Sequence, residues 1–189
     1  GVAFKCIAYW PVAIEGRRFL SFSVLFNVTD RNLHQLRFSS TARNPGFYWH
    51  NIARARQDWW RYLVDNKELP ACFDNSPTDQ GATIMTRYVS GDTIVAYATG
   101  YGAVGYGVID DPDTYEIISV GDARDVLDGE CRHRIRIRWI ATAQELSQAI
   151  PPADVRNEFG IYHPISTSVS MSGQKGERLA RRMDEIFHT

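Results

Sequence analysis

Four arginines alternate with mostly apolar residues in the segment 131–140. In a β-strand, residues two positions apart project from the same face, so these guanidinium groups are expected on one face, about 7 Å apart. The four residues are Arg132, Arg134, Arg136 and Arg138. Such a row could follow the phosphates of a nucleic-acid strand. It could instead be a solvated face that pairs with the acidic stretch Asp122–Glu130.

Aromatic side chains are the second group that could bind a ligand. Rings stack on nucleobases and form cages around methylated groups, although most aromatic residues belong to a core. We expect Trp59 and Trp139 in the core. Tyr101 lies between glycines in a turn, where a core position is harder to explain.

The segment Gly100–Gly105 matches the GxGxxG pattern of dinucleotide-binding proteins. That pattern binds a pyrophosphate when it leaves a strand and opens a helix. Here the glycines lead into 104–109, which has the composition of a strand. We therefore reject a dinucleotide site and expect a hairpin whose glycines allow a bulge or a close approach.

Hydrolytic and metal chemistry have little support in the sequence. The five histidines form no HxH or HxxxH pair, and no two cysteines have zinc-ligand spacing. Cys72 has no histidine nearby in the chain, and Asp110-Asp111 stand beside Pro112 in a predicted turn. We expect no catalytic residues, no metal and no cofactor. The three cysteines make no paired framework, which favours a reducing, cytoplasmic compartment.

Composition predicts a folded globular chain rather than a disordered or membrane-spanning one. The 189 residues are 44% hydrophobic and 12% aromatic, and the longest apolar run, 19–28, is interrupted by polar residues. The net charge is −1, which argues against a bulk electrostatic coat on nucleic acid but not against a local pocket. Only three cations are lysines, so arginine supplies most of the positive charge.

The N-terminal part is predicted to be rich in strands. Segments 2–12 and 19–28 flank a Glu15-Gly16 turn and suggest a hairpin, and 35–38 adds a short strand. Residues 39–46 mark a break. We expect a β-rich extension over 1–45 and a second domain over 46–189. The chain begins Gly-Val-Ala, which we interpret as one part of a longer protein.

The second domain is predicted to mix helices and strands. Helices are expected over 48–66 and 173–187, with a short one over 143–150 that Pro151-Pro152 ends. A loop is expected over 67–83. The predicted strands are 93–98, 103–109, 115–120 and 131–140. Short connections between strands favour an α+β fold, with a small curved β-barrel and flanking helices.

The order of motifs from residue 49 to 187 resembles the EVE domain, a branch of the PUA-like superfamily. It runs through the segment 48–54 (YWHNIAR), Trp59-Trp60, the strand 91–97 (GDTIVAY) and the glycine segment 100–109. The strand 133–139 (HRIRIRW) and a closing amphipathic helix follow. The resemblance covers about three-quarters of the chain. Many EVE strands end in Tyr-His-Ser where this chain has Tyr97-Ala98-Thr99, and residues 1–45 have no counterpart.

This resemblance implies a non-catalytic domain that binds one methylated or hydroxymethylated base, such as 5-methylcytosine, flipped out of a strand. It also implies DNA more than RNA as the partner. EVE-like modules of prokaryotes are often fused to nucleases or AAA motors that restrict modified phage DNA, so an antiviral restriction role is the expectation. A flipped base needs an aromatic slot, polar groups for its edge and cations on the flanking backbone.

The sequence-predicted site follows from these motifs. The base-binding candidates are Trp49, Asn51, Trp60, Tyr97, Thr99, Tyr101 and Tyr106. The backbone-binding candidates are Arg54, Arg87, Arg132, Arg134, Arg136 and Arg138.

Other functions stay open at this point. One is a PUA-like module that binds structured or modified RNA. Another is an enzyme or a small-nucleotide-binding domain that uses the segment Tyr97–Gly107 as its cleft, and a third is a plain interaction module.

Overall fold

The computed structural model describes residues 7–8, 24–25, 43–53 and 56–187. The chain forms two compact units, 1–42 and 43–189. In the first unit, β1 (Ile7–Ala8) pairs antiparallel with β2 (Val24–Leu25). This pairing agrees with the predicted hairpin in the residues described, whereas the predicted strand 35–38 lies outside them.

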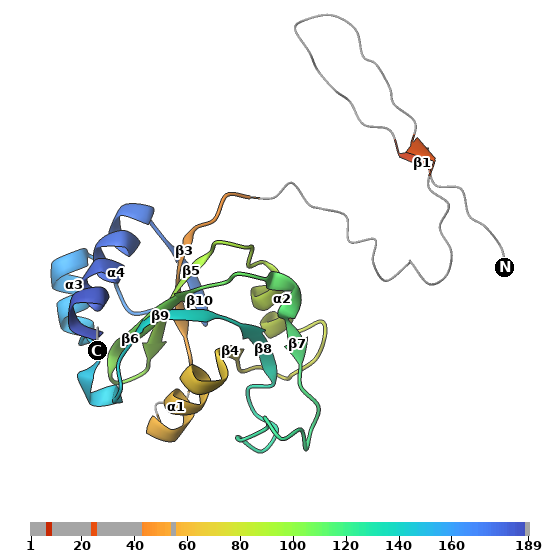
Figure 1. The fold of residues 1–189 in the computed structure, drawn as a ribbon, viewed down its shortest axis with the longest axis horizontal. Helices are drawn as coiled ribbons and strands as arrows, with labels where there is room; N and C mark the ends of the chain where they lie inside the picture. Colours follow the sequence, from red (N-terminus) through yellow and green to blue (C-terminus); the bar gives the residue numbers. More distant parts are fainter. Residues whose placement is uncertain (1–6, 9–23, 26–42, 54–55, 188–189) are drawn as a thin grey trace, which may run out of the picture. The chain divides into compact units, whose positions relative to one another are not determined.

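The second unit is built on a five-stranded sheet with the order β10-β3-β5-β6-β9 (Figure 1). Within it, β3 and β5 run parallel, and every other pairing is antiparallel. The strands are β3 (Phe47–Asn51), β5 (Thr93–Ala98), β6 (Gly102–Val108), β9 (Arg138–Thr142) and β10 (Ser168–Met171).

A second, three-stranded sheet has the order β4-β8-β7. Its strands are β4 (Glu68–Ala71), β7 (Glu116–Ile117) and β8 (His133–Arg136). Only Ile137 separates β8 from β9, and its N–H donates to the Lys67 carbonyl in register with the β4–β8 pairing. The α+β class is confirmed. The strands described form two open sheets, so the predicted curved β-barrel is corrected.

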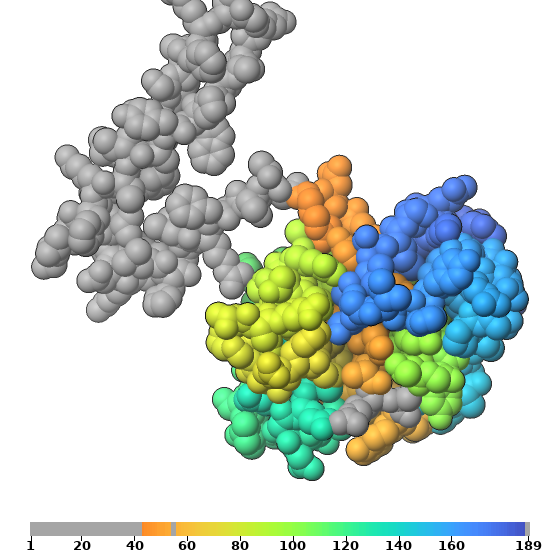
Figure 2. Space-filling view, turned by 180° about the vertical axis from the view of Figure 1, so that it is seen from behind, coloured from red at the N-terminus to blue at the C-terminus, as the bar shows by residue number. Residues whose placement is uncertain are grey.

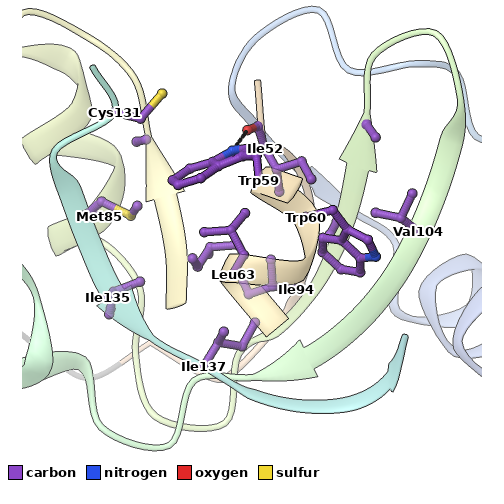
Figure 3. Close-up of a cluster of buried hydrophobic side chains, with 14 of the residues drawn as sticks. Ile52, Trp59, Trp60, Leu63, Met85, Ile94, Val104, Cys131, Ile135 and Ile137 are labelled. Atoms are coloured by element: carbon purple, nitrogen blue, oxygen red, sulfur yellow. Dashed lines mark hydrogen bonds between the residues drawn. The ribbon is translucent and has the colours of Figure 1, made fainter. Parts of the chain in front are cut away.

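Helices cover the large sheet on both sides. Helix α1 (Gln57–Asn66) buries Trp59, Trp60 and Leu63 in one core cluster (Figure 3). Helices α3 (Pro152–Phe159) and α4 (Gly173–Phe187) pack against the opposite face and build the second cluster. Helix α2 (Gln80–Thr86) packs against β4 and β8. Two short 3₁₀ turns, η1 (Pro112–Thr114) and η2 (Leu146–Gln148), complete the unit.

Two predicted helices differ from the structure. The prediction over 48–66 merged β3 with α1, because β3 is buried on both faces and its apolar residues show no period of two. Residues 143–150 hold only the turn η2, and Pro151-Pro152 begins α3 rather than ending a helix. Proline is favoured in the first helical turn because its missing N–H would have no partner there.

The predicted loop 67–83 contains β4 and the first turn of α2. Strand β4 was not predicted because Glu68 and Pro70 are poor strand formers. It is tolerated as an edge strand of the three-stranded sheet, where a proline need not donate on its open side.

The glycine-rich segment forms the strand β6, which confirms that no helix follows the GxGxxG pattern. Its glycines permit close contact with β9. A Cβ on Gly107 would lie 2.6 Å from the Arg138 carbonyl oxygen, and one on Gly105 would lie 2.8 Å from that of Ala141. Side chains at these positions would push β6 and β9 apart.

His50 connects three strands and the segment after α2 in the interior. Its Nε2 lies 2.7 Å from the Pro70 carbonyl, which can only accept, so Nε2 carries the proton and Nδ1 accepts from the Tyr88 hydroxyl at 2.7 Å. The Tyr88 hydroxyl in turn lies 2.7 Å from the Ser168 hydroxyl. Burial lowers the pKa of His50 from 6.5 to about 4, so the imidazole stays neutral in the folded protein.

We predict that His50 makes folding acid-sensitive. Its pKa is depressed on folding, so its contribution is complete above pH 6.5 and is lost as pH falls toward 4. Urea unfolding at about pH 7 and about pH 4 should show a decline in the free energy of unfolding on the order of 3 kcal/mol from this group.

The comparison variant is His50→Asn. Its free energy of unfolding should be lower at both pH values, but the decline between them that comes from His50 should be absent. His163→Gln, at an exposed histidine, should retain the wild-type slope. An unchanged slope in His50→Asn would contradict the assignment.

Candidate functional site

Residues with positive φ cluster around one cleft of the second unit. Among the residues described, five that are not glycine have positive φ: Ala53, Lys67, Asn75, Asp128 and Cys131. Three of the five line a single cleft of about 480 Å³, and Asp128 is adjacent in sequence to a fourth wall residue. The walls are Ala53, Cys72, Phe73, Asn75, Gly129, Glu130 and Cys131. Left-handed backbone costs about 1–3 kcal/mol at residues such as Ala53 and Cys131 and concentrates at functional sites, whereas asparagine adopts it more readily.

The cleft lies where three separate segments meet. Ala53 follows the end of β3, Cys72–Asn75 follow β4, and Gly129–Cys131 precede β8. In Figure 2 the yellow segment after β4 lies beside the blue-green segment before β8. The volume falls within the roughly 300–1,000 Å³ of small-ligand sites.

Asn51 holds Ala53 in its left-handed conformation (φ 65°). The Asn51 Oδ1 accepts from the Ala53 N–H at 2.9 Å, and Asn51 Nδ2 donates to Thr99 Oγ1 at 3.2 Å. Because β3 and β5 are parallel, the ends of both strands meet at this edge. Two sequence-predicted residues, Asn51 and Thr99, are therefore brought together and set the shape of one wall.

Asn75 fixes the opposite walls to each other. Its Nδ2 donates to the Gly129 carbonyl at 3.0 Å, and its Oδ1 accepts from the Arg132 N–H at 2.8 Å. Arg132 also donates from Nη1 to the Ile118 carbonyl at 3.1 Å, while its buried Nε has no hydrogen-bond partner among the residues described. Arg132 thus supports the cleft rather than facing outward in a row.

A disulfide joins Cys72 to Cys131 in the cleft wall. The expectation that no cysteines pair is corrected. The two residues are 59 apart in sequence, and the pairing Ala71↔His133 between β4 and β8 brings them together. The proximity of the two cysteines therefore arises only from the tertiary fold. Within the described part of the chain, no group of three or more His, Cys, Asp or Glu side chains could hold a metal ion.

The predicted aromatic slot is divided between the two faces of the large sheet. Trp49 and Tyr97 pack together on the α3–α4 side, with ring centroids 5.2 Å apart. Trp60 lies in the other core cluster, where its indole donates to the Ala143 carbonyl at 2.8 Å. These three rings do not share a slot, because Trp60 belongs to α1 rather than to the strand that carries Trp49.

The other two aromatic candidates also stand apart from the cleft. Tyr106 is buried, and its hydroxyl donates to Asp184 at 2.7 Å. Burial and this carboxylate raise the pKa of Tyr106, so the phenol is neutral. Tyr101 lies in the β5–β6 turn and is 41% exposed.

The four arginines of 132–138 do not form one solvent face, which corrects that expectation. Arg134 is 1% exposed and pairs with the buried Glu68 at 3.1 Å. Burial lowers the pKa of its guanidinium, and the Glu68 carboxylate opposes that shift. Arg136 is exposed, and Arg138 belongs to β9, where it pairs with Asp110 at 2.7 Å.

The last two predicted backbone-binding residues are Arg87 and Arg54. Arg87 donates to the Ser168 carbonyl at 3.0 Å and lies over the Tyr48 ring. Arg54 lies outside the residues described, next in the chain to the cleft residue Ala53.

Sequence reasoning missed Phe73, Asn75 and Gly129 as site residues. Two weak signals were present. Asparagine tolerates the left-handed region, and Asn75 precedes Ser76-Pro77, while Asp128-Gly129 is a typical turn pair. Neither signal indicates that the two turns face one cleft.

Comparison with known proteins finds structural likeness only. No protein-family model and no curated protein matches the sequence. Solved YTH domains are similar in structure. The Toxoplasma CPSF4 YTH domain is 12% identical, with 79% of this chain and 94% of that chain covered and a TM-score of 0.48.

Two further YTH structures show the same level of likeness. The YTH domain of Zygosaccharomyces rouxii MRB1, in complex with N6-methyladenosine RNA, is 9% identical over 72% of this chain and 86% of that one, with a TM-score of 0.49. The Mmi1 YTH domain complex with RNA is 14% identical over 74% and 79%, with a TM-score of 0.47. None of these three is an EVE domain, so the EVE resemblance stays a prediction.

We predict that Arg134 acts on stability. Arg134→Ala should lower the free energy of unfolding by about 3–5 kcal/mol, because it removes the buried cation from the Glu68 carboxylate and leaves only the more exposed Arg124, 3.7 Å away. Arg136→Ala, at an exposed position of the same strand, should change it by less than about 0.5 kcal/mol. Chemical denaturation measures both. Equal midpoints for the two variants would contradict the buried ion pair.

Proposed function

We propose that the second unit is a non-catalytic nucleic-acid-binding domain that accepts one modified base in the cleft between Ala53, Asn75 and Cys131. The observation that carries the proposal is the convergence of left-handed, non-glycine residues on that one cleft. The strain is maintained by side-chain hydrogen bonds from Asn51 and Asn75, which indicates a wall shaped for an occupant.

The lining supplies what a flipped base requires. Phe73 is half-buried against the core and provides an aromatic ring. Gly129 leaves room beside the backbone, and the Asn75 amide, besides its bonds to Gly129 and Arg132, has a second Nδ2 hydrogen and a second Oδ1 lone pair for a base edge. Base recognition combines stacking with a few hydrogen bonds of this kind.

The charge distribution supports binding at a pocket more than along a surface. Arg134 and Arg138 are engaged by Glu68 and Asp110, so they do not form a track for phosphates. Arg54, next to Ala53 in the chain, is the candidate for the flanking backbone. Stacking worth ~1–3 kcal/mol per base supplies affinity that a chain of net charge −1 cannot gain from bulk electrostatics.

A direct comparison of binding to RNA and to DNA decides which of the two is the partner. Some YTH structures similar to this chain are complexes with RNA, one of them carrying N6-methyladenosine. DNA as partner, a fused nuclease or AAA motor, and an antiviral role remain predictions from the EVE resemblance. Among the residues described, no helix is long and apolar enough to cross a membrane.

We predict a measurable preference for a modified base. Fluorescence anisotropy would compare single-stranded RNA and DNA oligonucleotides of one sequence, plain or with one N6-methyladenine, 5-methylcytosine or 5-hydroxymethylcytosine. Tighter binding of at least one modified oligonucleotide is expected. The proposal is wrong if none is preferred in either RNA or DNA.

The variant Phe73→Leu should reduce affinity for the preferred oligonucleotide by about 5–100-fold, because it removes the ring but keeps an apolar side chain. Phe47→Leu makes the same change at a half-buried position on the other face of the large sheet and should leave affinity unchanged. Equal effects of the two variants would place the base elsewhere.

A further inference from the structure

A second pocket lies on the α3–α4 side of the large sheet. Its volume is about 350 Å³, and it is lined by Trp49, residues 160–165 and 169–172, and Lys175. This pocket shares no residue with the cleft proposed for the base.

Trp49 has a hydrogen-bond donor without an acceptor. The side chain is only 2% exposed, and its indole Nε1 is buried with no partner among the residues described. The indoles of Trp59, Trp60 and Trp139 instead donate to the carbonyls of Ile52, Ala143 and Leu63. Buried donors are almost always paired, so the Trp49 N–H indicates an acceptor that the described residues do not supply.

The rest of the pocket is mostly apolar and carries no negative charge. Ile161, Pro164, Val169 and Met171 contribute apolar surface, and none of the described residues that line it bears a carboxylate. Lys175 Nζ donates to the Gly160 carbonyl at 2.7 Å, so this cation is already engaged. A mostly apolar lining makes the desolvation of a charged ligand costly, so the pocket suits a neutral, mainly apolar ligand.

The entrance is formed by side chains that the fold leaves exposed. Ile165 is 91% exposed and Tyr162 is 70% exposed, although both are large and apolar or aromatic. They belong to the connection 160–167, which has neither helix nor strand. Exposed side chains change rotamer within nanoseconds, so they can move aside and admit a ligand to the covered indole.

We propose that this pocket binds a small, neutral, mainly apolar molecule that carries one carbonyl or ring-nitrogen acceptor, which accepts a hydrogen bond from the Trp49 indole. Apolar contact supplies the affinity, and the indole N–H selects for the acceptor. The inference does not depend on the proposed base cleft.

The test uses two probes of similar shape, acetophenone with a carbonyl acceptor and ethylbenzene without one. Titrations of the full chain, followed by the indole ¹H–¹⁵N signals, report on each tryptophan separately. The Trp49 signal is assigned by its absence in Trp49→Phe. Acetophenone should shift this signal, while the paired indoles of Trp59, Trp60 and Trp139 stay in place and show that the fold is intact.

The decisive quantity is the preference for acetophenone over ethylbenzene. We expect about a threefold to tenfold preference in the wild type and none in Trp49→Phe, because the lost contact is one hydrogen bond. Ile165→Ser should weaken both probes without disturbing the fold, whereas Ile140→Ser, at an exposed position outside the pocket lining, should not. A preference that persists in Trp49→Phe, or that is absent from the wild type, would overturn the proposal.

Discussion

The parallel pairing of β3 with β5 is the constraint on which the rest of the second unit depends. It places the ends of both strands at the same edge of the sheet, where Asn51 bonds to Thr99 and turns the chain at Ala53. A parallel pair also needs a long crossover, and here that crossover includes α1, β4 and α2. The walls of the cleft proposed for the base and the core on that side of the sheet both follow from this one pairing.

Successive side chains of β3 point to opposite faces of the large sheet, and the two faces differ in chemistry. Phe47 and Trp49 face α3 and α4, whereas Tyr48 and His50 face the core built on α1. The strand therefore contributes a ring to one pocket and a neutral imidazole to the opposite interior. A single segment that looks like one aromatic motif in sequence contributes to a pocket on one face of the sheet and to the core on the other.

The sequence predicted those elements whose local pattern matches their environment. Strand β5 and helix α4 have the predicted bounds, because one is a continuous apolar run between turns and the other is strongly amphipathic. The failures have tertiary causes. Strand β3 is covered on both faces, Arg134 is buried because Glu68 comes from another strand to pair with it, and Cys72 meets Cys131 only after β4 and β8 pair. Asn51 and Thr99 are among the predicted site residues and meet beside the cleft, but the turns that complete the cleft were not predicted, since no local pattern shows that they face each other.

The most direct test of the base cleft is a map of backbone amide signals by ¹H–¹⁵N NMR during titration with the preferred modified oligonucleotide, compared with its plain counterpart. The account predicts that the difference between the two titrations is concentrated at Ala53, at 72–75 and at 129–131. A difference concentrated instead at the exposed Arg136 and Arg138, or at the Trp49 pocket, would contradict it.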